Sequence, residues 1–377
     1  MPLPEIFFAE GDARALAAKL KKFYEAVRQA SGEPSYSIGA ADPMKLVQLS
    51  EAAILAQVNT DIDATGKGNL LYYAGDETIE HLGLLYGSRG ARLRPCAAVT
   101  VVEYTLSTLR NVATVIPAGF RTTPDNKLFF ATEEPLTIPA GEISGVVRAS
   151  CLVAGTAGNG FAEGEIKNIV DRSPFVQSAV NITVSAGGAD LEGLEEYRAR
   201  IQLLPESFAV AGPDEAYKFW AKTANANIVD VAVWSPAPVE VNVVPLMKGG
   251  RAPEREVLDA VRAVLSDRTR RPLTDFVHVM PPRMTDYDVD FKYWIRASDA
   301  AQAAAIQLAV YQAAARFAEW QSEALGRDIN PSVLHHMIME AGVKRAVINA
   351  PVFTVLEHDQ VGKAAAQTIT YGGLEDD

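Results

Sequence analysis

Residues 286–296 read DYDVDFKYWIR, the most regular alternation of apolar and charged side chains in the chain. In a β-strand, alternate side chains point to opposite faces. The apolar face would carry Tyr287, Val289, Phe291, Tyr293 and Ile295, and the charged face Asp286, Asp288, Asp290, Lys292 and Arg296. A shift by one residue would bury the charges, so the stretch predicts a strand of well-defined register.

The residues after this strand predict two helices and a further strand. Apolar residues at helical spacing indicate a long helix that includes Ile306 and Trp320, and a shorter one that includes Leu334 and Ala341. Residues 352–356 are rich in β-branched side chains and are expected to form the last strand.

A similar succession precedes the strand. Val239, Val241 and Val243 alternate with polar residues, as expected for a strand with one face in water. Residues 257–265 then carry valine and leucine at helical spacing, and residues 276–279 predict another strand. Two successive passes of strand, helix and strand suggest two small α/β units.

Residues 97–184 differ in composition and contain short runs rich in Val, Ile, Thr and Phe. Turn signals separate these runs at residues 117–119, 124–126, 139–141 and 158–160. This spacing indicates an all-β sandwich or barrel and leaves its topology open.

The segment after this β region predicts a helix that begins at Asp190. The Asp190 side chain could cap free N–H groups, and Glu192, Glu195 and Glu196 would lie near the positive end of the helix dipole. Pro205 interrupts the chain, and Gly212-Pro213 does so again before the next helix.

The first 90 residues or so predict helices. One amphipathic helix carries its apolar stripe from Leu16 to Val27. Asp42 followed by Pro43 predicts the capped start of a second helix, and Asp76 could cap a third.

These elements predict an α+β multi-domain chain, because 377 residues exceed one ordinary domain. Its central domain is expected to be β-sandwich-like and its C-terminal region mixed α/β. The expected parts are an N-terminal helical region (1–95), a β-rich domain (96–189), a first α/β unit with leading helices (190–283) and a second α/β unit with a C-terminal tail (284–377).

The composition argues against several classes of protein. A net charge of -12 argues against binding to nucleic acid, which requires clustered Lys and Arg. It also disfavours binding to anionic membranes. The sequence suggests neither a signal peptide nor a membrane-spanning run, so no membrane insertion is expected. The two cysteines, Cys96 and Cys151, are expected to be buried free thiols.

Two glycine-rich segments could be mistaken for phosphate loops. Residues 155–160 (GTAGNG) lack the following Lys-Ser or Lys-Thr and precede no expected helix, and residues 66–68 (GKG) lack the required spacing. Both are expected to be turns.

The titratable clusters also have plain structural interpretations. His335 and His336 would diverge on a helix, while His336 and Glu340 share a face but are too few for zinc. Asp286, Asp288 and Asp290 could hold calcium, but they lack the rest of a calcium loop and favour a solvated or partner-facing strand. Four arginines lie at the end of the helix predicted at residues 257–265 or just after it: Arg262, Arg268, Arg270 and Arg271. They could bind a phosphate, but we expect them to complement the helix dipole.

The order of signals from Tyr73 onward resembles the baseplate J-like family, the wedge proteins of contractile phage tails, tailocins and related injection systems. The most specific run is GGAD at 187–190, with Glu192, Glu195, Tyr197, Arg198, Arg200 and Ile201, and then GP at 212–213 with Glu215 and Tyr217. Other matching segments are YAGDETIEHLG (73–83) with Tyr86, Gly87 and Arg89, IPAG (116–119 and 138–141) with Phe130, AGTAGN (154–159), PLTD (272–275) and INPSVL (329–334).

The resemblance implies a structural role without catalytic residues, cofactors or metals. In this interpretation Gly188 adopts a positive φ, Asp190 caps a helix and Gly212-Pro213 redirects the chain. The implied partners are further copies of the chain, a smaller wedge protein resembling the tail protein I family, and sheath-initiator and hub proteins. The implied location is the tail baseplate of a virion or tailocin, after assembly in the host cytoplasm.

A tail-associated hydrolase of cell-wall glycan is the alternative. Its acid and base could be Asp286 with Asp288 or Glu192 with Glu195, although one strand or one helix turn does not naturally place carboxylates across a cleft. An adhesin is a third option, for which fibre repeats or a C-terminal β tip would be expected. The small polar tail at residues 372–377 does not suggest one.

Overall fold

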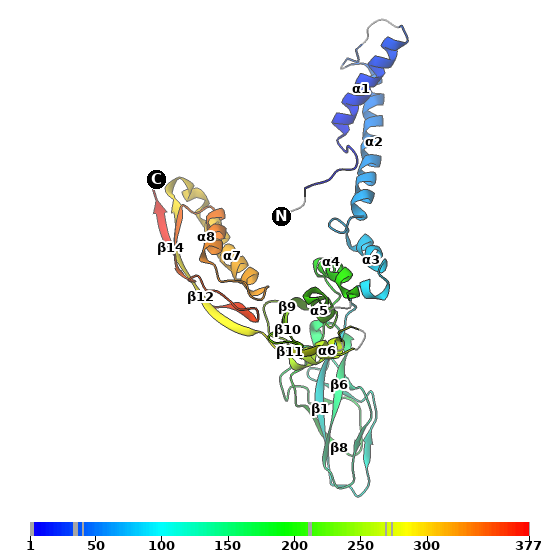
Figure 1. Cartoon of the computed structure of the whole chain (residues 1–377), viewed down its shortest axis with the longest axis vertical. Coiled ribbons are helices and arrows are strands. Elements are labelled where there is room, and N and C mark those ends of the chain that lie inside the picture. The colour runs from blue at the N-terminus through cyan, green and yellow to red at the C-terminus, as the bar shows by residue number, and fades with distance from the viewer. Residues whose placement is uncertain are drawn as a thin grey trace. The chain divides into compact units, whose positions relative to one another are not determined.

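The computed structural model describes residues 4–32, 37–39, 41–209, 213–267, 270–272 and 274–376. The chain forms two compact units, Met1–Ala91 and Arg92–Asp377, each of which is described by itself (Figure 1). The α+β multi-domain class predicted above is confirmed. The boundaries at residues 95, 189 and 283 remain a prediction.

The first unit is helical, as predicted. It contains α1 (Ala13–Ala30), α2 (Pro43–Gly68), α3 (Asp76–Leu84) and a 3-10 turn η1 (Gly87–Gly90). Asp42 caps α2 by accepting a hydrogen bond from the Met44 N–H at 2.9 Å, as predicted. The cap predicted at Asp76 is wrong, because Gly75 occupies that position.

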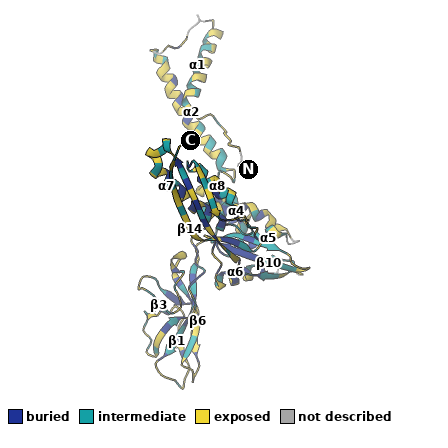
Figure 2. Ribbon diagram, turned by 90° about the vertical axis from the view of Figure 1, so that its left-hand side faces the viewer, coloured by how far each residue is buried: buried dark blue, intermediate teal, exposed yellow. Residues whose placement is uncertain are grey.

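Two further features of the first unit differ from expectation. Residues 66–68 form the last turn of α2 instead of a loop turn, and Gly66 lies against the ring of Phe8, where a Cβ would be 2.6 Å from the ring. α1 is amphipathic, but none of its residues is buried, and it is yellow and teal in Figure 2. Phe23 on its apolar stripe is 71% exposed.

The second unit begins with the predicted β region. Its main sheet is nearly closed and has the order β7-β3-β4-β6-β1-β8, and β2 and β5 form a separate pair. The Asn181 N–H donates to the Ile166 carbonyl (3.2 Å) where β8 approaches the segment before β7. The strands are β1 (Ala97–Leu106), β2 (Thr114–Ile116), β3 (Arg121–Thr123), β4 (Phe130–Thr132), β5 (Leu136–Ile138), β6 (Ser144–Ala154), β7 (Asn168–Ile169) and β8 (Val176–Asn181). We call this part of the second unit the barrel.

A three-stranded sheet follows the barrel, with the order β11-β10-β9. β10 pairs parallel to β11 and antiparallel to β9. The elements are α4 (Leu194–Leu203), the 3-10 turn η3 (Leu204–Phe208), α5 (Asp214–Lys222), β9 (Ile228–Trp234), β10 (Glu240–Met247), α6 (Arg255–Leu265) and β11 (Phe276–Val279). We call this part the central region.

The predicted elements of the central region are present with three corrections. The helix expected from Asp190 begins at Leu194, with Gly193 at the cap position. Val239 precedes β10 and has a φ of 68°. Only residues 240–242 of β10 are partly exposed to solvent, because residues 243–247 are all buried. Gly212 lies outside the described residues, and Pro213 directly precedes α5, as predicted.

The last sheet has the order β13-β12-β14, with β12 antiparallel to β13 and parallel to β14. Its elements are β12 (Arg283–Arg296), the 3-10 turn η4 (Ala297–Gln302), α7 (Ala303–Ser322), α8 (Pro331–Glu340), β13 (Arg345–Ala350) and β14 (Gln360–Glu375). The alternation predicted for residues 286–296 is confirmed, because all five apolar side chains are buried.

The prediction for the C-terminal strand is wrong. Residues 352–356 make one isolated bridge, from Thr354 to Ile329, and Val352, Phe353 and Val355 are exposed. Pro351, which directly precedes this segment, has no N–H to donate to a ladder. β14 forms instead, and it includes most of the expected polar tail. Within the described residues, no helix has the length and apolarity needed to cross a bilayer.

Candidate functional site: the junction between the barrel and the central region

The junction forms where the chain enters and leaves the barrel. Cys96 and Ala189 exchange two backbone hydrogen bonds of 2.9 and 3.1 Å, and Val99 and Ala186 exchange two more of 2.8 and 3.0 Å. The two ends of the barrel are therefore held side by side at the point where the central region begins.

Gly188 has no room for a side chain. Asn159 donates from Nδ2 to the Gly188 carbonyl at 2.7 Å, and its Oδ1 accepts from the Gly188 N–H at 2.8 Å. A Cβ on Gly188 would collide with the Gly155 carbonyl oxygen and lie 2.9 Å from Asn159 Oδ1. The prediction of a positive φ at Gly188 is wrong, because Gly187 has it (86°). Gly188 is required for space.

Asp190 holds the glycine-rich turn instead of a helix. Its carboxylate accepts hydrogen bonds from the Thr156 N–H (3.0 Å) and the Thr156 hydroxyl (2.8 Å). These bonds favour the charged form and lower the pKa of Asp190. The prediction that Asp190 caps a helix is therefore wrong. The turn predicted at residues 155–160 is confirmed, because residues 156–158 form a single 3-10 turn.

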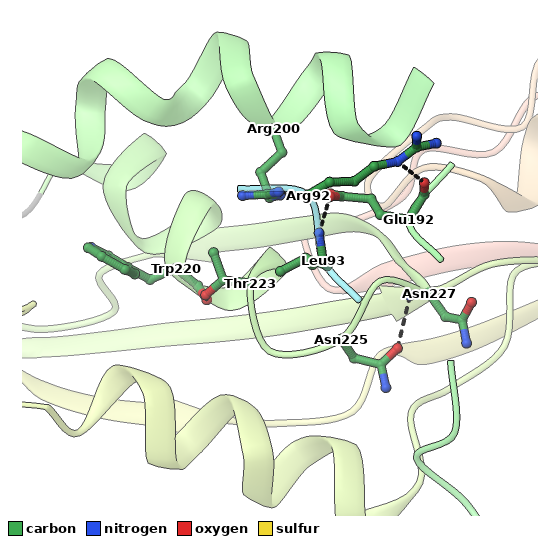
Figure 3. Close-up of polar contacts among 8 residues, drawn as sticks. All are labelled: Arg92, Leu93, Glu192, Arg200, Trp220, Thr223, Asn225 and Asn227. Atoms are coloured by element: carbon green, nitrogen blue, oxygen red, sulfur yellow. Dashed lines mark hydrogen bonds and ion pairs between the residues drawn. The ribbon is translucent and has the colours of Figure 1, made fainter. Parts of the chain in front are cut away.

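Two asparagines of the central region bind the same glycine segment. Asn225 Nδ2 donates to the Gly187 carbonyl at 3.0 Å, and Asn227 Nδ2 donates to the Gly188 carbonyl at 3.2 Å. The Asn227 N–H in turn donates to Asn225 Oδ1 at 2.9 Å (Figure 3). The loop between α5 and β9 is thus fixed to the exit of the barrel.

A buried ion pair completes the junction. Glu192 and Arg200 are 3% and 1% exposed, and they form a bidentate pair with N···O distances of 2.6 and 2.7 Å. Glu192 Oε2 also accepts from the Leu93 N–H (2.9 Å), while Arg92 Nε donates to the Glu192 carbonyl (2.7 Å) (Figure 3). The pair therefore joins α4 to the segment that enters the barrel.

The geometry of the ion pair defines what it can do chemically. Both carboxylate oxygens of Glu192 are already bonded, and the Arg200 guanidinium also lies 5.3 Å from the centre of the buried Tyr197 ring. A fully bonded carboxylate is poorly placed to exchange protons with a substrate. The arrangement suits a rigid joint, since an ion pair with matched hydrogen bonds fixes one geometry.

Two pockets adjoin the junction. One, of about 330 Å³, is lined by Gly187, Gly188 and the three asparagines described above, together with Arg251 and Glu254. The other, of about 290 Å³, is lined by Glu195, Glu196, Lys222 and Glu323 among others. Burial lowers the pKa of Lys222, and the nearby Asp230 carboxylate opposes that shift.

The cysteines are free, as predicted, but only Cys151 is buried. Cys96 is exposed, which corrects the expectation. Its thiol donates a hydrogen bond to the Gly187 carbonyl, with an Sγ···O distance of 3.2 Å. Desolvation raises the pKa of Cys96, so its reactive thiolate form is disfavoured.

The remaining candidate residues lie apart from the junction. His336 and Glu340 share a face of α8 and approach to 3.3 Å, both largely exposed. Among the described residues no group of three or more His, Cys, Asp or Glu side chains could hold a metal ion. The exposed Asp286 and Asp288 share one face of β12 with the half-buried Asp290.

The arginine cluster largely follows the prediction. Arg262 lies in the last turn of α6, and Arg270 donates to the Val264 carbonyl at 3.3 Å, close to the end of that helix. Arg271 instead donates to the Asp275 carbonyl, and Arg268 lies outside the described residues.

Four residues of the junction were not predicted from the sequence: Arg92, Leu93, Asn225 and Asn227. The only available signal was the Asn-x-Asn spacing at residues 225–227, which is also common in ordinary turns. Glu192 and Arg200 were both noted, but nothing in the sequence indicated that they pair.

Comparison with known proteins gives two family matches. The model of the Baseplate J-like protein barrel domain matches residues 103–188, and that of the Baseplate J-like central domain matches residues 209–281. Baseplate protein J of Escherichia phage P2 is 28% identical over 208 residues, which are 53% of this chain and 66% of that protein. The match therefore spans slightly less than two thirds of the relative.

A solved structure gives a weaker likeness. A chain in the cryo-EM structure of the anti-feeding prophage (AFP) baseplate, 6-fold symmetrised, aligns over 96% of this chain and 100% of its own length. The sequence identity is 12% and the TM-score 0.45.

Proposed function

This chain belongs to the baseplate J-like family, and from that premise we propose that it is a structural component of the baseplate of a contractile phage tail or a related injection particle. The observation that carries the proposal is the pair of family matches. They occur in sequence order on the barrel and the central region, and Asp190, Glu192 and Arg200, which lie between the two matches, contribute to the junction.

In the finer form of the proposal, the chain acts as a wedge protein. Copies of the chain, together with a smaller wedge protein resembling the tail protein I family, would form a ring around the hub and contact the sheath-initiator protein. Opening of that ring would release contraction of the sheath. Ring-closing contacts of this kind require two different patches on each chain.

The junction has the properties that such a mechanical role requires. The bonds from Asn225 and Asn227 to the exit of the barrel and the buried Glu192–Arg200 pair, which also holds Leu93, join the central region to the barrel through several independent contacts. A joint of this type would pass a displacement from one part to the next with little local deformation, because tightly packed interiors transmit strain. The proposed location is accordingly the virion or tailocin baseplate.

The hydrolase alternative receives no support from the geometry. A glycosidase needs two carboxylates that face each other across a cleft. Asp286 and Asp288 share one exposed strand face, and Glu192 is bonded to Arg200 and Leu93. We therefore propose no catalytic role for these carboxylates.

The test is to induce lysis of the source cells, separate the particles on a density gradient, and identify this chain by mass spectrometry alongside electron micrographs of each fraction. We expect the chain in fractions that contain contractile tails or isolated baseplates. If it is found only in the soluble fraction while intact tails lack it, the proposal is wrong, and a cell-wall clearing assay becomes the next experiment.

A further inference from the structure

The glycine-rich turn at residues 155–160 contains the one Asn-Gly pair of the sequence, Asn159-Gly160. Asparagine is among the thermally labile residues of proteins, because its side-chain amide can be lost by deamidation. A following glycine favours this loss, since it has no Cβ to keep its backbone nitrogen away from the asparagine side chain. The sequence therefore places a chemically labile pair inside the junction.

Deamidation at this position needs no reactant other than water. The Gly160 backbone nitrogen loses its proton and attacks Cγ of Asn159. A new N–Cγ bond forms, the Cγ–Nδ2 bond breaks, and Nδ2 leaves with a proton as ammonia. Water then opens the resulting succinimide ring, and the product at position 159 is aspartate or isoaspartate.

The junction restrains both reacting groups. The Gly160 N–H donates to the Ser185 carbonyl at 2.7 Å, so the attacking nitrogen is held in place. The ψ angle of Asn159 is 154°, an extended value that keeps this nitrogen out of the plane of the ring that must form. The Asn159 amide is bonded at both ends to Gly188, at 2.7 and 2.8 Å. Ring closure requires both groups to rotate, and these bonds prevent the rotation.

The restraining partners belong to one short segment at the exit of the barrel, residues 185–188, which we call the exit segment. Asn225 and Asn227 of the central region hold the same segment through two of its carbonyls, at 3.0 and 3.2 Å. The central region thus secures the segment that protects Asn159. Withdrawal of the exit segment from the turn would release the amide and the attacking nitrogen together.

We propose that Asn159 is a modification site, at which opening of the junction leads to deamidation of the side-chain amide. Asn159 stays intact while the exit segment lies on the turn, and it becomes labile when that segment withdraws. The inference goes beyond the proposed function and does not depend on it, because it follows from the contacts of the junction and the chemistry of the Asn-Gly pair.

The modification would oppose reclosure of the junction. Nδ2 of Asn159 donates to the Gly188 carbonyl, whereas a carboxylate has no proton to donate and places a negative charge against that carbonyl oxygen. Isoaspartate also lengthens the backbone of the turn by a methylene group. Either product therefore weakens the joint between the turn and the exit segment.

The rate of deamidation should report how often the junction opens. Proteins open locally with free energies that range from near zero to that of global unfolding. When reclosing is faster than the chemical step, the rate of modification follows the population of the open form. Substitutions that loosen the exit segment should therefore accelerate deamidation without altering Asn159 itself.

The test follows deamidation of the full-length chain in mildly alkaline buffer by peptide mapping with mass spectrometry. Asn159 should persist at least about tenfold longer in the folded chain than in denaturant, because ring closure needs an open junction. A variant with Asn225→Ala and Asn227→Ala loses two bonds to the exit segment, so Asn159 should deamidate at least about fivefold faster. Asn227→Ala alone should give a smaller increase, and it replaces the double variant if the latter does not fold.

Asn349→Ala is the matched control, because Asn349 is an exposed asparagine that bonds to Asp290 in the last sheet at 3.1 Å. This substitution should leave the rate at Asn159 unchanged, and circular dichroism would verify the fold of every variant. Asn159→Asp reproduces one product and should lower the melting temperature of the chain.

Three results would overturn the inference. In the first, Asn159 deamidates as fast in the folded chain as in denaturant, and in the second it stays intact even in denaturant. In the third, a folded variant that lacks Asn225 and Asn227 deamidates no faster than the unchanged chain. An unchanged melting temperature of Asn159→Asp would contradict the weakening of the joint by the modification.

Discussion

Gly188 and Arg200 are two residues of the junction that leave little room for substitution. Gly188 leaves space for the Gly155 carbonyl, and Arg200 neutralises the charge of Glu192 inside the protein. Substitution is unfavourable at both positions for different physical reasons. A side chain at position 188 would clash with the turn, and loss of Arg200 would leave a buried charge without its partner.

Arg200→Ala should lower the free energy of unfolding by about 3 to 5 kcal/mol, because it leaves the Glu192 carboxylate buried without its partner. Urea unfolding followed by tryptophan fluorescence measures the change. Glu195→Gln is the control, since the Glu195 side chain is 76% exposed in its pair with Arg198 and its loss should cost about 1 kcal/mol or less. Equal effects of both substitutions would contradict the structural role of the buried pair.

Gly188→Ala should destabilise the chain by about 1 to 3 kcal/mol, because the new Cβ overlaps the Gly155 carbonyl and must displace the turn. Gly39→Ala offers a comparison, since a Cβ at Gly39 would meet nothing within 4 Å. We expect that control to change stability by less than about 0.5 kcal/mol. Unchanged thermal stability of Gly188→Ala would show that the turn is less tightly packed than described.

At the scale of elements, one ion pair ties an edge of the barrel to its neighbouring loop. Arg121 on β3 forms hydrogen bonds to Asp171, just beyond β7, with an Nη2···Oδ1 distance of 2.7 Å. These bonds favour the ionised carboxylate and hold the pKa of Asp171 below its usual range. The short strand β7 depends on few other contacts with β3, since only two residue pairs connect them.

The contribution of Asp171 to stability should therefore depend on pH. A carboxylate whose pKa is depressed by folding stabilises the protein above its unfolded pKa of about 4, and this contribution is lost as the pH falls through the lower folded value. Asp171→Asn should reduce stability at neutral pH and have a smaller effect near pH 3. Urea titrations at both pH values measure this difference.

Glu134→Gln serves as the control for this prediction, because no ion pair of Glu134 occurs in the part of the chain that the structure describes. Its effect on stability should be small at both pH values. If Asp171→Asn destabilised the chain equally at neutral and acid pH, hydrogen-bond geometry instead of charge would explain its role.

Two segments of the second unit show when the local sequence is sufficient to predict a strand. The strand at 286–296 could be predicted because its alternation is unbroken. A shift of its register by one residue would bury charged side chains. The strand predicted at 352–356 had the right composition, yet no ladder formed beyond one bridge. Pairing partners lie far away in sequence, so β propensity alone does not identify which apolar segment joins a sheet.

At the scale of the whole molecule, the two compact units differ in how much they bury. Among the residues that the structure describes, the first unit has few buried apolar side chains, and α1 has none, whereas the second unit forms three apolar cores. Helices without a buried face owe little of their stability to tertiary packing.

We therefore expect hydrogen exchange of the isolated chain to be faster in α1 than in β12 by several orders of magnitude, since local opening costs less where few contacts are lost. Mass spectrometry of exchanged peptides measures both segments in one sample. Equal protection of α1 and β12 would contradict the difference in packing. Within α2, the segment around the buried Ala52 and Ala56 should exchange more slowly than α1.

Sequence alone determined the class of this protein, the order of most of its elements and its family resemblance. Those features rest on local periodicity, on turn residues and on their spacing, all of which are written along the chain. Only the tertiary structure decided that Asp190 holds a distant turn, that Gly188 is needed for space and that Glu192 pairs with Arg200. Each of these depends on which remote segments meet, and that choice follows from long-range packing, which no local pattern encodes.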